Sequence, residues 1–166
     1  GKPEDKLGIR GSDTCELYFD DVKIPKENLI DAEGSGFKIA LDTLDGGRIG
    51  IASQALGIAQ ASLDASIKYS KERKQFNKPI ASFQGIQFKM TDMSIGIESA
   101  RLLTRKAAWL KDNNFPYGIQ AAMAKLYASE IAMKSSTDCV QIHGGYGYIR
   151  ETGVERLMRD AKITQI

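Results

Sequence analysis

Apolar residues recur every three or four positions over most of the chain after residue 34, the spacing of one helix face. The clearest run spans residues 83–110 and predicts one helix of about seven or eight turns. A break at residues 112–116 (DNNFP) separates it from a second expected helix, residues 117–142. The stripe of the first helix consists of Phe83, Ile86, Met90, Met93, Ile97, Ala100, Leu103, Ala107 and Leu110. The expected face of the second consists of Ile119, Met123, Leu126, Met133 and Val140.

Two further segments complete the helical pattern. Residues 36–73 read as helical but contain Gly46 and Gly47, and paired glycines weaken a helix interior, so we expect an interruption at residues 45–48. Residues 155–163 indicate the start of one more helix. Three or four long helices joined by short breaks predict an antiparallel bundle.

Residues 1–33 follow a different pattern. Residues 16–24 (ELYFDDVKI) largely alternate between polar and apolar and end at Pro25, and residues 7–10 indicate a second short strand. Two strands leave a hydrophobic face and both edges unpaired, so we expect them to belong to a sheet whose remainder lies outside this sequence. We therefore divide the chain into a β tail, residues 1–33, and a helical domain, residues 34–166, and interpret it as part of a longer protein.

Composition narrows the class of protein. The 166 residues are 42% hydrophobic, enough for a buried core, and 23 basic against 21 acidic residues give a net charge of +2. That balance gives no electrostatic reason to expect binding to nucleic acid or to an anionic membrane, and no apolar stretch is long enough to span a bilayer. Cys15 and Cys139 lie far apart and predict neither a disulfide framework nor a zinc site, and we expect no metal site.

Two arginines are candidates for binding an anion. Arg73 ends an expected helix, where its guanidinium can hold a phosphate through two hydrogen bonds. It can equally be a solvated cap favoured by the helix dipole, which is the simpler interpretation from the residues alone. Arg48 closes the Asp45–Arg48 joint, where it can bind a substrate or pair with Asp45.

Residues 141–148 (QIHGGYGY) directly follow an expected helix. Their glycines allow the backbone to approach a flat ligand closely, or they simply end the helix; both interpretations remain open. The segment is not a dinucleotide fingerprint, because that motif follows a strand. His143 is the one histidine, and no Ser or Cys nucleophile is placed beside it by spacing, so a structural role is the simpler one.

Taken in order, four segments resemble the flavin-dependent acyl-CoA dehydrogenase family. Residues 12–25 look like the end of its middle β-domain, and residues 34–38 (GSGFK) look like the entry to its C-terminal helical domain. Residues 73–84 look like its R-x-x-F-G-x-x-I…F-Q segment, with Asn77 in place of the usual Gly. Residues 141–148 look like its Q-x-x-G-G-x-G-Y loop. The resemblance implies a mainly α fold: an antiparallel four-helix-bundle domain preceded by the last strands of a β-barrel domain.

The resemblance also implies a set of binding residues. In the family the helical domain reaches across a subunit interface to the partner's FAD, in a homo-oligomer that is commonly a tetramer built as a dimer of dimers. Arg73 would pair with the pyrophosphate and Gln84 would hydrogen-bond the cofactor, so the phosphate role becomes the favoured one for Arg73. The adenosine side would be lined by Gln141, Ile142, His143, Gly144 and Gly145. The acyl-CoA would lie along Asp45, Gly46, Gly47 and Arg48.

The implied reaction oxidises an acyl-CoA to the trans-2-enoyl-CoA. A glutamate removes the α-proton, the β-hydrogen leaves as hydride to FAD, and the electrons pass to an electron-transfer flavoprotein. The overall resemblance and the small Gly46–Gly47 joint favour a short acyl chain. Residues 159–166 (RDAKITQI) match the stretch before the family's base, so we expect that glutamate two residues beyond Ile166. A minority branch places the base at the position of Gly47, which cannot act as one.

Two alternatives stand beside this interpretation. The chain can belong to an acyl-CoA oxidase or another specialised branch of the family. It can also act as a non-catalytic helical oligomerisation module. The lack of secretion features favours a bacterial cytoplasm or a mitochondrial matrix.

Overall fold

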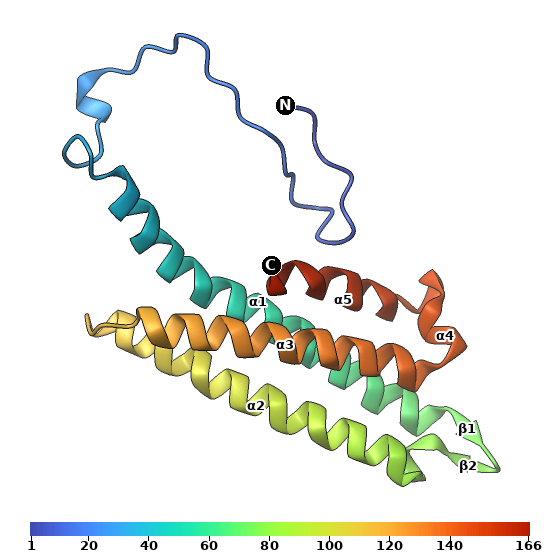
Figure 1. The fold of residues 1–166 in the computed structure, drawn as a ribbon. Helices are drawn as coiled ribbons and strands as arrows, with labels where there is room; N and C mark the ends of the chain where they lie inside the picture. Colours follow the sequence, from blue (N-terminus) through green and yellow to red (C-terminus); the bar gives the residue numbers. More distant parts are fainter.

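Three long helices form the body of the molecule in the computed structural model, which describes residues 1–166 (Figure 1). They are α1 (Gly36–Glu72), α2 (Gln84–Asp112) and α3 (Gly118–His143), and α2 runs antiparallel to the other two. A fourth helix, α5 (Val154–Ala161), packs across α1 and α3 after the single turn α4 (Gly145–Tyr148). The fold confirms the expected mainly α four-helix bundle.

Short elements connect these helices. Strand β1 (Lys74–Gln75) pairs antiparallel with β2 (Lys78–Pro79), with Lys74 opposite Pro79. Both residues of the intervening turn, Phe76 and Asn77, have positive φ, the conformation that a tight two-residue hairpin requires. Asn adopts this conformation more readily than most residues, which explains how it stands where the family usually has Gly. The 3-10 turns are Lys26–Asn28, Ile80–Ser82, Arg150–Thr152 and Lys162–Gln165.

The expected stripe of α2 is confirmed. Met93, Ile97, Ala100 and Ala107 are at most 1% exposed, and the other stripe residues are half-buried. The close approach of α3 depends on a small residue beside this stripe: a Cβ at Gly96 would lie 2.7 Å from Ile131 Cδ1. The three-to-four spacing therefore identified both the helix and its buried face.

The expected apolar face of α3 is wrong. Ile119, Met123 and Leu126 are 74%, 51% and 64% exposed, and Met133 and Val140 are only half-buried. The buried face instead carries small side chains, which let α3 pack closely on the alanines of α1. Larger side chains in this layer would push the helices apart. The facing alanines are Ala121, Ala124, Ala128 and Ala132 on α3, and Ala52, Ala55 and Ala59 on α1.

The expected interruption at residues 45–48 is also wrong, because α1 continues through Gly46 and Gly47 without a break. Each interior glycine costs about 1 kcal/mol relative to alanine, which the remaining packing of α1 against α3 and α2 outweighs. Gly46 lies beside the end of α2: a Cβ there would approach Lys111 Nζ to 3.0 Å.

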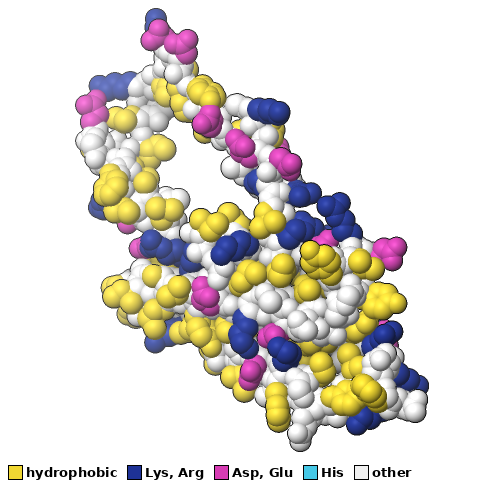
Figure 2. Space-filling model, turned by 45° about the vertical axis from the view of Figure 1, so that its right-hand side comes forward, with side chains coloured by type: hydrophobic (Ala, Val, Ile, Leu, Met, Phe, Trp, Pro, Cys, Tyr) yellow, Lys and Arg dark blue, Asp and Glu magenta, His cyan; other side chains and the backbone are white.

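Residues 1–33 form no strand, contrary to expectation. They are irregular, with bends or turns at residues 7–12, 20–21 and 31–32 and a 3-10 turn at Lys26–Asn28, and in the space-filling view they stand away from the bundle around an open gap (Figure 2). A strand needs a partner, and nothing in residues 1–166 supplies one. Leu17, Tyr18 and Phe19 are consequently 74–77% exposed. The assignment of this segment to a β-domain stays a prediction.

The N-terminal segment touches the bundle at α5. The Ile9 amide donates to Asp160 Oδ1 at 2.7 Å, and Arg159 Nη1 donates to the Leu7 carbonyl at 2.9 Å. Gly8 lies so close to the Arg159 carbonyl that a side chain there would overlap with the backbone. No helix of the chain combines the length and apolar character needed to cross a bilayer.

Candidate binding site

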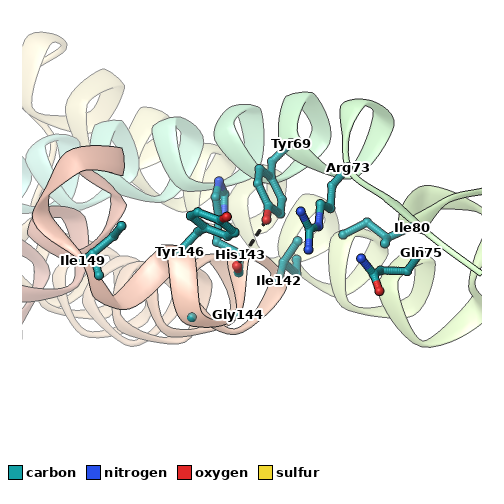
Figure 3. Close-up of a pocket in the computed structure, with 10 residues that line it drawn as sticks. Tyr69, Arg73, Gln75, Ile80, Ile142, His143, Gly144, Tyr146 and Ile149 are labelled. Carbon is teal, nitrogen blue, oxygen red and sulfur yellow. Dashed lines mark hydrogen bonds between the residues drawn. The ribbon is translucent and has the colours of Figure 1, made fainter.

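A cavity of about 560 Å³ lies where the C-terminal ends of α1 and α3 meet (Figure 3). It brings together five of the residues predicted to bind a cofactor, although they come from distant parts of the sequence: Arg73, Ile142, His143, Gly144 and Gly145. The remaining lining residues are Tyr69, Gln75, Ile80, Tyr146 and Ile149.

Hydrogen bonds hold the backbone of Arg73, whereas its side-chain N–H donors have no partner within the chain. As the C-cap of α1 it donates its amide to the Tyr69 carbonyl at 2.8 Å, and its own carbonyl accepts from the Ile80 amide at 2.9 Å. Its guanidinium carbon lies 5.5 Å from the centre of the Tyr146 ring, in cation–π range. It forms no ion pair and no side-chain hydrogen bond within the chain. Its donors therefore remain available to oxygens of a ligand.

An aromatic pair forms the wall beside Arg73. The rings of Tyr69 and His143 stack at 4.2 Å and 22°, and the Tyr69 hydroxyl lies 3.4 Å from the His143 carbonyl, as the dashed line in Figure 3 marks. His143 is only 7% exposed, and its Nδ1 lies 2.8 Å from the Cys139 carbonyl. Because a carbonyl only accepts, Nδ1 carries the proton in this arrangement. The histidine is thus held in one orientation as part of the wall.

The Cys139–His143 pair is not arranged as a nucleophile and base. Cys139 Sγ lies 3.8 Å from His143 Nδ1, the nitrogen already used toward the backbone. Burial raises the pKa of the Cys139 thiol, and a hydrogen bond with Ser66 opposes this shift only in part. The thiolate is therefore disfavoured, and the thiol behaves as a core side chain.

The glycines of residues 144–147 have two structural roles: one allows an unusual backbone conformation, and another allows close packing against α3. Gly144 ends α3 with φ 60° and ψ −137°, a conformation that L side chains rarely adopt. A Cβ on Gly147 would overlap with the Val140 carbonyl, whereas the Cβ position of Gly145 is open. The interpretation that glycine ends the helix is therefore confirmed, and the backbone of Gly144 and Gly145 lines the cavity without side chains. Its approach to a flat ligand stays a prediction.

Two of the predicted cofactor residues lie outside this cavity. Gln141 lines an adjoining cavity of about 420 Å³ together with Phe76 and Phe83. Gln84, the first residue of α2, is exposed and lines neither cavity.

Four lining residues were not predicted from the sequence: Tyr69, Gln75, Ile80 and Ile149. A signal existed only for Tyr69, which precedes Arg73 by one helical turn and so shares its helix face. Gln75 and Ile80 lie in the segment of residues 73–84 that carries the family resemblance, but nothing in that pattern indicated that their side chains line the cavity.

The predicted substrate residues lie on α1, far from this cavity. Arg48 Nη1 contacts Asp45 Oδ1, and both side chains are partly exposed, at 41% and 33%. The ion pair that we considered as one alternative is therefore present, and it leaves one face of Arg48 in solvent. Arg73 is the C-cap of the helix that contains Arg48, and the helical rise over 25 residues separates the two backbone positions by about 38 Å along the axis.

Comparisons with known proteins agree on one relationship. Residues 34–166 match the family model described as acyl-CoA dehydrogenase, C-terminal domain. The mitochondrial short-chain specific acyl-CoA dehydrogenase of Mus musculus is 59% identical over 166 residues, which are 100% of this chain and 40% of that protein. The structure of butyryl-CoA dehydrogenase from Megasphaera elsdenii matches with a TM-score of 0.99 at 58% identity, over 100% of this chain and 43% of that one.

A third match comes from structural work on the electron transferring flavoprotein of Acidaminococcus fermentans. That chain has a TM-score of 0.99 at 58% identity, over 100% of this chain and 44% of its own length. The present chain thus spans about two fifths of the length of these relatives.

Proposed function

Because the chain belongs to the acyl-CoA dehydrogenase family, we propose that it is the helical part of a flavin-dependent enzyme that oxidises a short-chain acyl-CoA to the trans-2-enoyl-CoA. Relatives named for short-chain acyl-CoA and for butyryl-CoA, at 58–59% identity over the whole chain, support this substrate class. The observation that carries the proposal is the convergence of Arg73 with Gly144 and Gly145 on one cavity.

The cavity fits the diphosphate and adenosine part of FAD. Arg73 offers unpaired donors to a phosphate, and Tyr146 steadies its guanidinium from the other side. The stacked Tyr69 and His143 offer a flat wall, and the side-chain-free edge at Gly144 admits the bulk of a ring system. When bound, FAD supplies the acceptor for the hydride that leaves the β-carbon of the substrate.

The separation of the two sites supports a role for a second subunit. Along the axis of one helix, about 38 Å separates the backbone of Arg48, on the proposed substrate side, from that of Arg73, at the proposed FAD side. This separation favours an arrangement in which the flavin next to the acyl-CoA of this chain is a different flavin from the one that Arg73 would hold. This favours a homo-oligomer, a tetramer in our proposal, in which the cavity serves the FAD of a partner subunit.

In this proposal the residues near Arg48 bind the substrate but do not transfer a proton. Arg48 would contact the acyl-CoA while Asp45 holds its guanidinium, and Gly47, whose Cβ position is open, leaves space along α1 for the acyl chain. We assign the base that removes the α-proton to a glutamate beyond Ile166, since position 47 is glycine. Electrons would then pass to an electron-transfer flavoprotein. Because relatives come from a bacterium and from mitochondria, our proposal covers a bacterial cytoplasm or a mitochondrial matrix.

The proposal is tested with the full-length enzyme. We expect anaerobic butyryl-CoA to bleach the flavin absorbance faster than C8 or C16 acyl-CoA does, and a preference for C16 would reject the short-chain assignment. Arg73→Ala should lower the ratio of bound flavin to protein after gel filtration at least about tenfold, because a charge-assisted pair to phosphate is lost. Lys71→Ala removes a cation from the same helix end outside the cavity and should retain the flavin. Equal retention by both variants would contradict the role of Arg73.

A further inference from the structure

Residues 7–9 and the end of α5 meet, although Ile9 and Asp160 are 151 positions apart in the sequence. The Ile9 amide donates to Asp160 Oδ1 at 2.7 Å, and Arg159 Nη1 donates to the Leu7 carbonyl at 2.9 Å. Glu155, one turn earlier on α5, accepts from Arg159 Nη2 at 3.0 Å. Figure 1 shows the first turn of the chain beside α5. We call this contact the α5 clamp; its members are Leu7, Gly8, Ile9, Arg159 and Asp160.

The two backbones of the α5 clamp fit each other closely. A Cβ at Gly8 would lie 2.4 Å from the Arg159 carbonyl oxygen and 2.8 Å from Asp160 Cα, so a glycine is required there. Ile9 has φ 47°, a conformation that β-branched residues rarely adopt, and Asp160 accepts its amide. Strained backbone persists only where its surroundings hold it, and it gathers at functional sites. The relative position of the two segments is therefore closely defined.

The α5 clamp lies on the proposed substrate side of the molecule. A cavity of about 400 Å³ is lined by residues of the clamp, by Ile51 of α1 and by Ile166. Ile51 follows Arg48 by three residues, so both lie on the same face of α1. The cavity beside the clamp therefore lies within about one helical turn of Arg48 along α1.

The segment between the α5 clamp and Ile166 is also held from a second direction. It forms the 3-10 turn Lys162–Gln165, and Gln165 Nε2 donates to Glu130 Oε1 of α3 at 2.9 Å. The Ile166 amide donates to the Ile163 carbonyl at 3.2 Å. A glutamate two residues further on would lie within about 7 Å of Ile166, since one extended residue spans at most about 3.6 Å. Its backbone would thus start from a point that the clamp and α3 fix together.

We propose that Asp160 is a positioning residue for the reaction: through the α5 clamp it sets the place from which the base reaches the α-carbon of the acyl-CoA. This inference rests on the proposed function and deepens it, because it names a residue of this chain that acts through the glutamate beyond Ile166. A base must lie within hydrogen-bond distance of the proton that it removes, and a misplacement of about 1 Å can lower the rate about 100-fold. Asp160 therefore controls the rate of proton removal without touching the reacting atoms.

Rapid anaerobic mixing of the full-length enzyme with saturating butyryl-CoA tests this role. The rate constant of flavin bleaching reports the removal of proton and hydride, whereas its amplitude reports the fraction of enzyme that is intact. We expect Asp160→Ala to lower the rate constant about tenfold or more, with the amplitude and the half-saturating concentration within about twofold of the wild type. Asp160→Asn keeps an acceptor oxygen for the Ile9 amide and should stay within about threefold. A merely structural role would lower the amplitude and leave the rate constant unchanged.

Two glycines of the same loop provide a matched pair of variants. Gly8→Ala forces the two backbones of the α5 clamp apart and should lower the rate constant as Asp160→Ala does. Gly11→Ala places its Cβ where no atom lies within 4 Å and should bleach at the wild-type rate. Equal rate constants for the two glycine variants, or a wild-type rate constant for Asp160→Ala, would overturn the inference.

Hydrogen exchange tests the α5 clamp separately from the chemistry, in flavin-bound enzyme without substrate. In Asp160→Ala, the Ile9 amide and the peptides from residue 162 to the base should exchange about tenfold faster than in the wild type. Unchanged exchange would refute the positioning role alone, because the clamp would then not fix this segment. A wild-type enzyme whose flavin is bleached by no acyl-CoA would instead reject the proposed function, and the role of Asp160 with it.

Discussion

Gly147 is the position where a single methyl group should do the most damage. A Cβ there would overlap with the Val140 carbonyl and lie 2.9 Å from His143 Cβ and 3.0 Å from the Val140 carbonyl carbon. Two of these three neighbours are backbone atoms of α3, which cannot rotate away as a flexible side chain can. Relief therefore requires α4 to move off the end of α3, which lowers the free energy of unfolding by about 1–3 kcal/mol.

The same movement should reach the cavity. Tyr146, next to Gly147, holds the Arg73 guanidinium, and Gly144 and Gly145 form the edge of the cavity. We expect Gly147→Ala to lower the urea midpoint of the full-length protein and to weaken flavin retention together. Gly145→Ala is the control, because its Cβ would meet no atom within 4 Å, and it should change the free energy of unfolding by less than about 0.5 kcal/mol. An unchanged midpoint for Gly147→Ala would refute the argument from close packing.

Three further outcomes are expected. Burial raises the pKa of the Cys139 thiol, so its thiolate stays scarce at pH 8; a thiol reagent should label Cys15 alone in the native chain and both cysteines in denaturant. Gly96→Ala places a Cβ 2.7 Å from Ile131 Cδ1 and should cost about 1–3 kcal/mol, part of which Ile131→Val restores in a double-mutant cycle. Tyr146→Ala should weaken flavin retention more than Tyr146→Phe, which keeps the ring beneath Arg73.

The buried face of α2 was predictable because its stripe recurs at helical spacing and includes Met93 and Ile97, the largest fully buried side chains of the chain. The buried face of α3 was not predictable, because on this helix the large apolar side chains are exposed and the small ones are buried. Its core side must be small to fit against α1, so Ala124 and Ala128 are buried while Ile119 and Leu126 are exposed. Hydrophobic spacing marks an apolar face, but it does not tell which of two faces meets another helix.

Local sequence also misjudged two backbone features. The intrinsic cost of Gly46 and Gly47 was correctly assessed, but a helix of 37 residues packed on two others absorbs it. The strand pattern of residues 16–24 was recognised, yet the segment is irregular and unpaired because pairing depends on residues elsewhere. In both cases the outcome is set by tertiary partners, which a single segment does not contain.

In the candidate site, too, some residues could be recognised from the sequence alone, while the position of others depends on the fold. Arg73 and the glycine segment stood out because each combines residues with a clear physical use, and they line one cavity, although their binding of a cofactor stays a prediction. Gln84 was carried over from the same resemblance, but it lies outside the cavity in the single chain.

The alanine layer explains why the cavity exists where it does. Small side chains at every turn, such as Ala59 against α3 and Ala128 against α1, keep these two helices in close contact along their length. The last turns of both helices then end side by side, so Tyr69 can stack on His143 and Arg73 can reach Tyr146. A looser core of leucines would separate the two ends and divide the cavity wall. The residues that bind therefore depend on residues that never touch the ligand, and the small size of those side chains is their contribution.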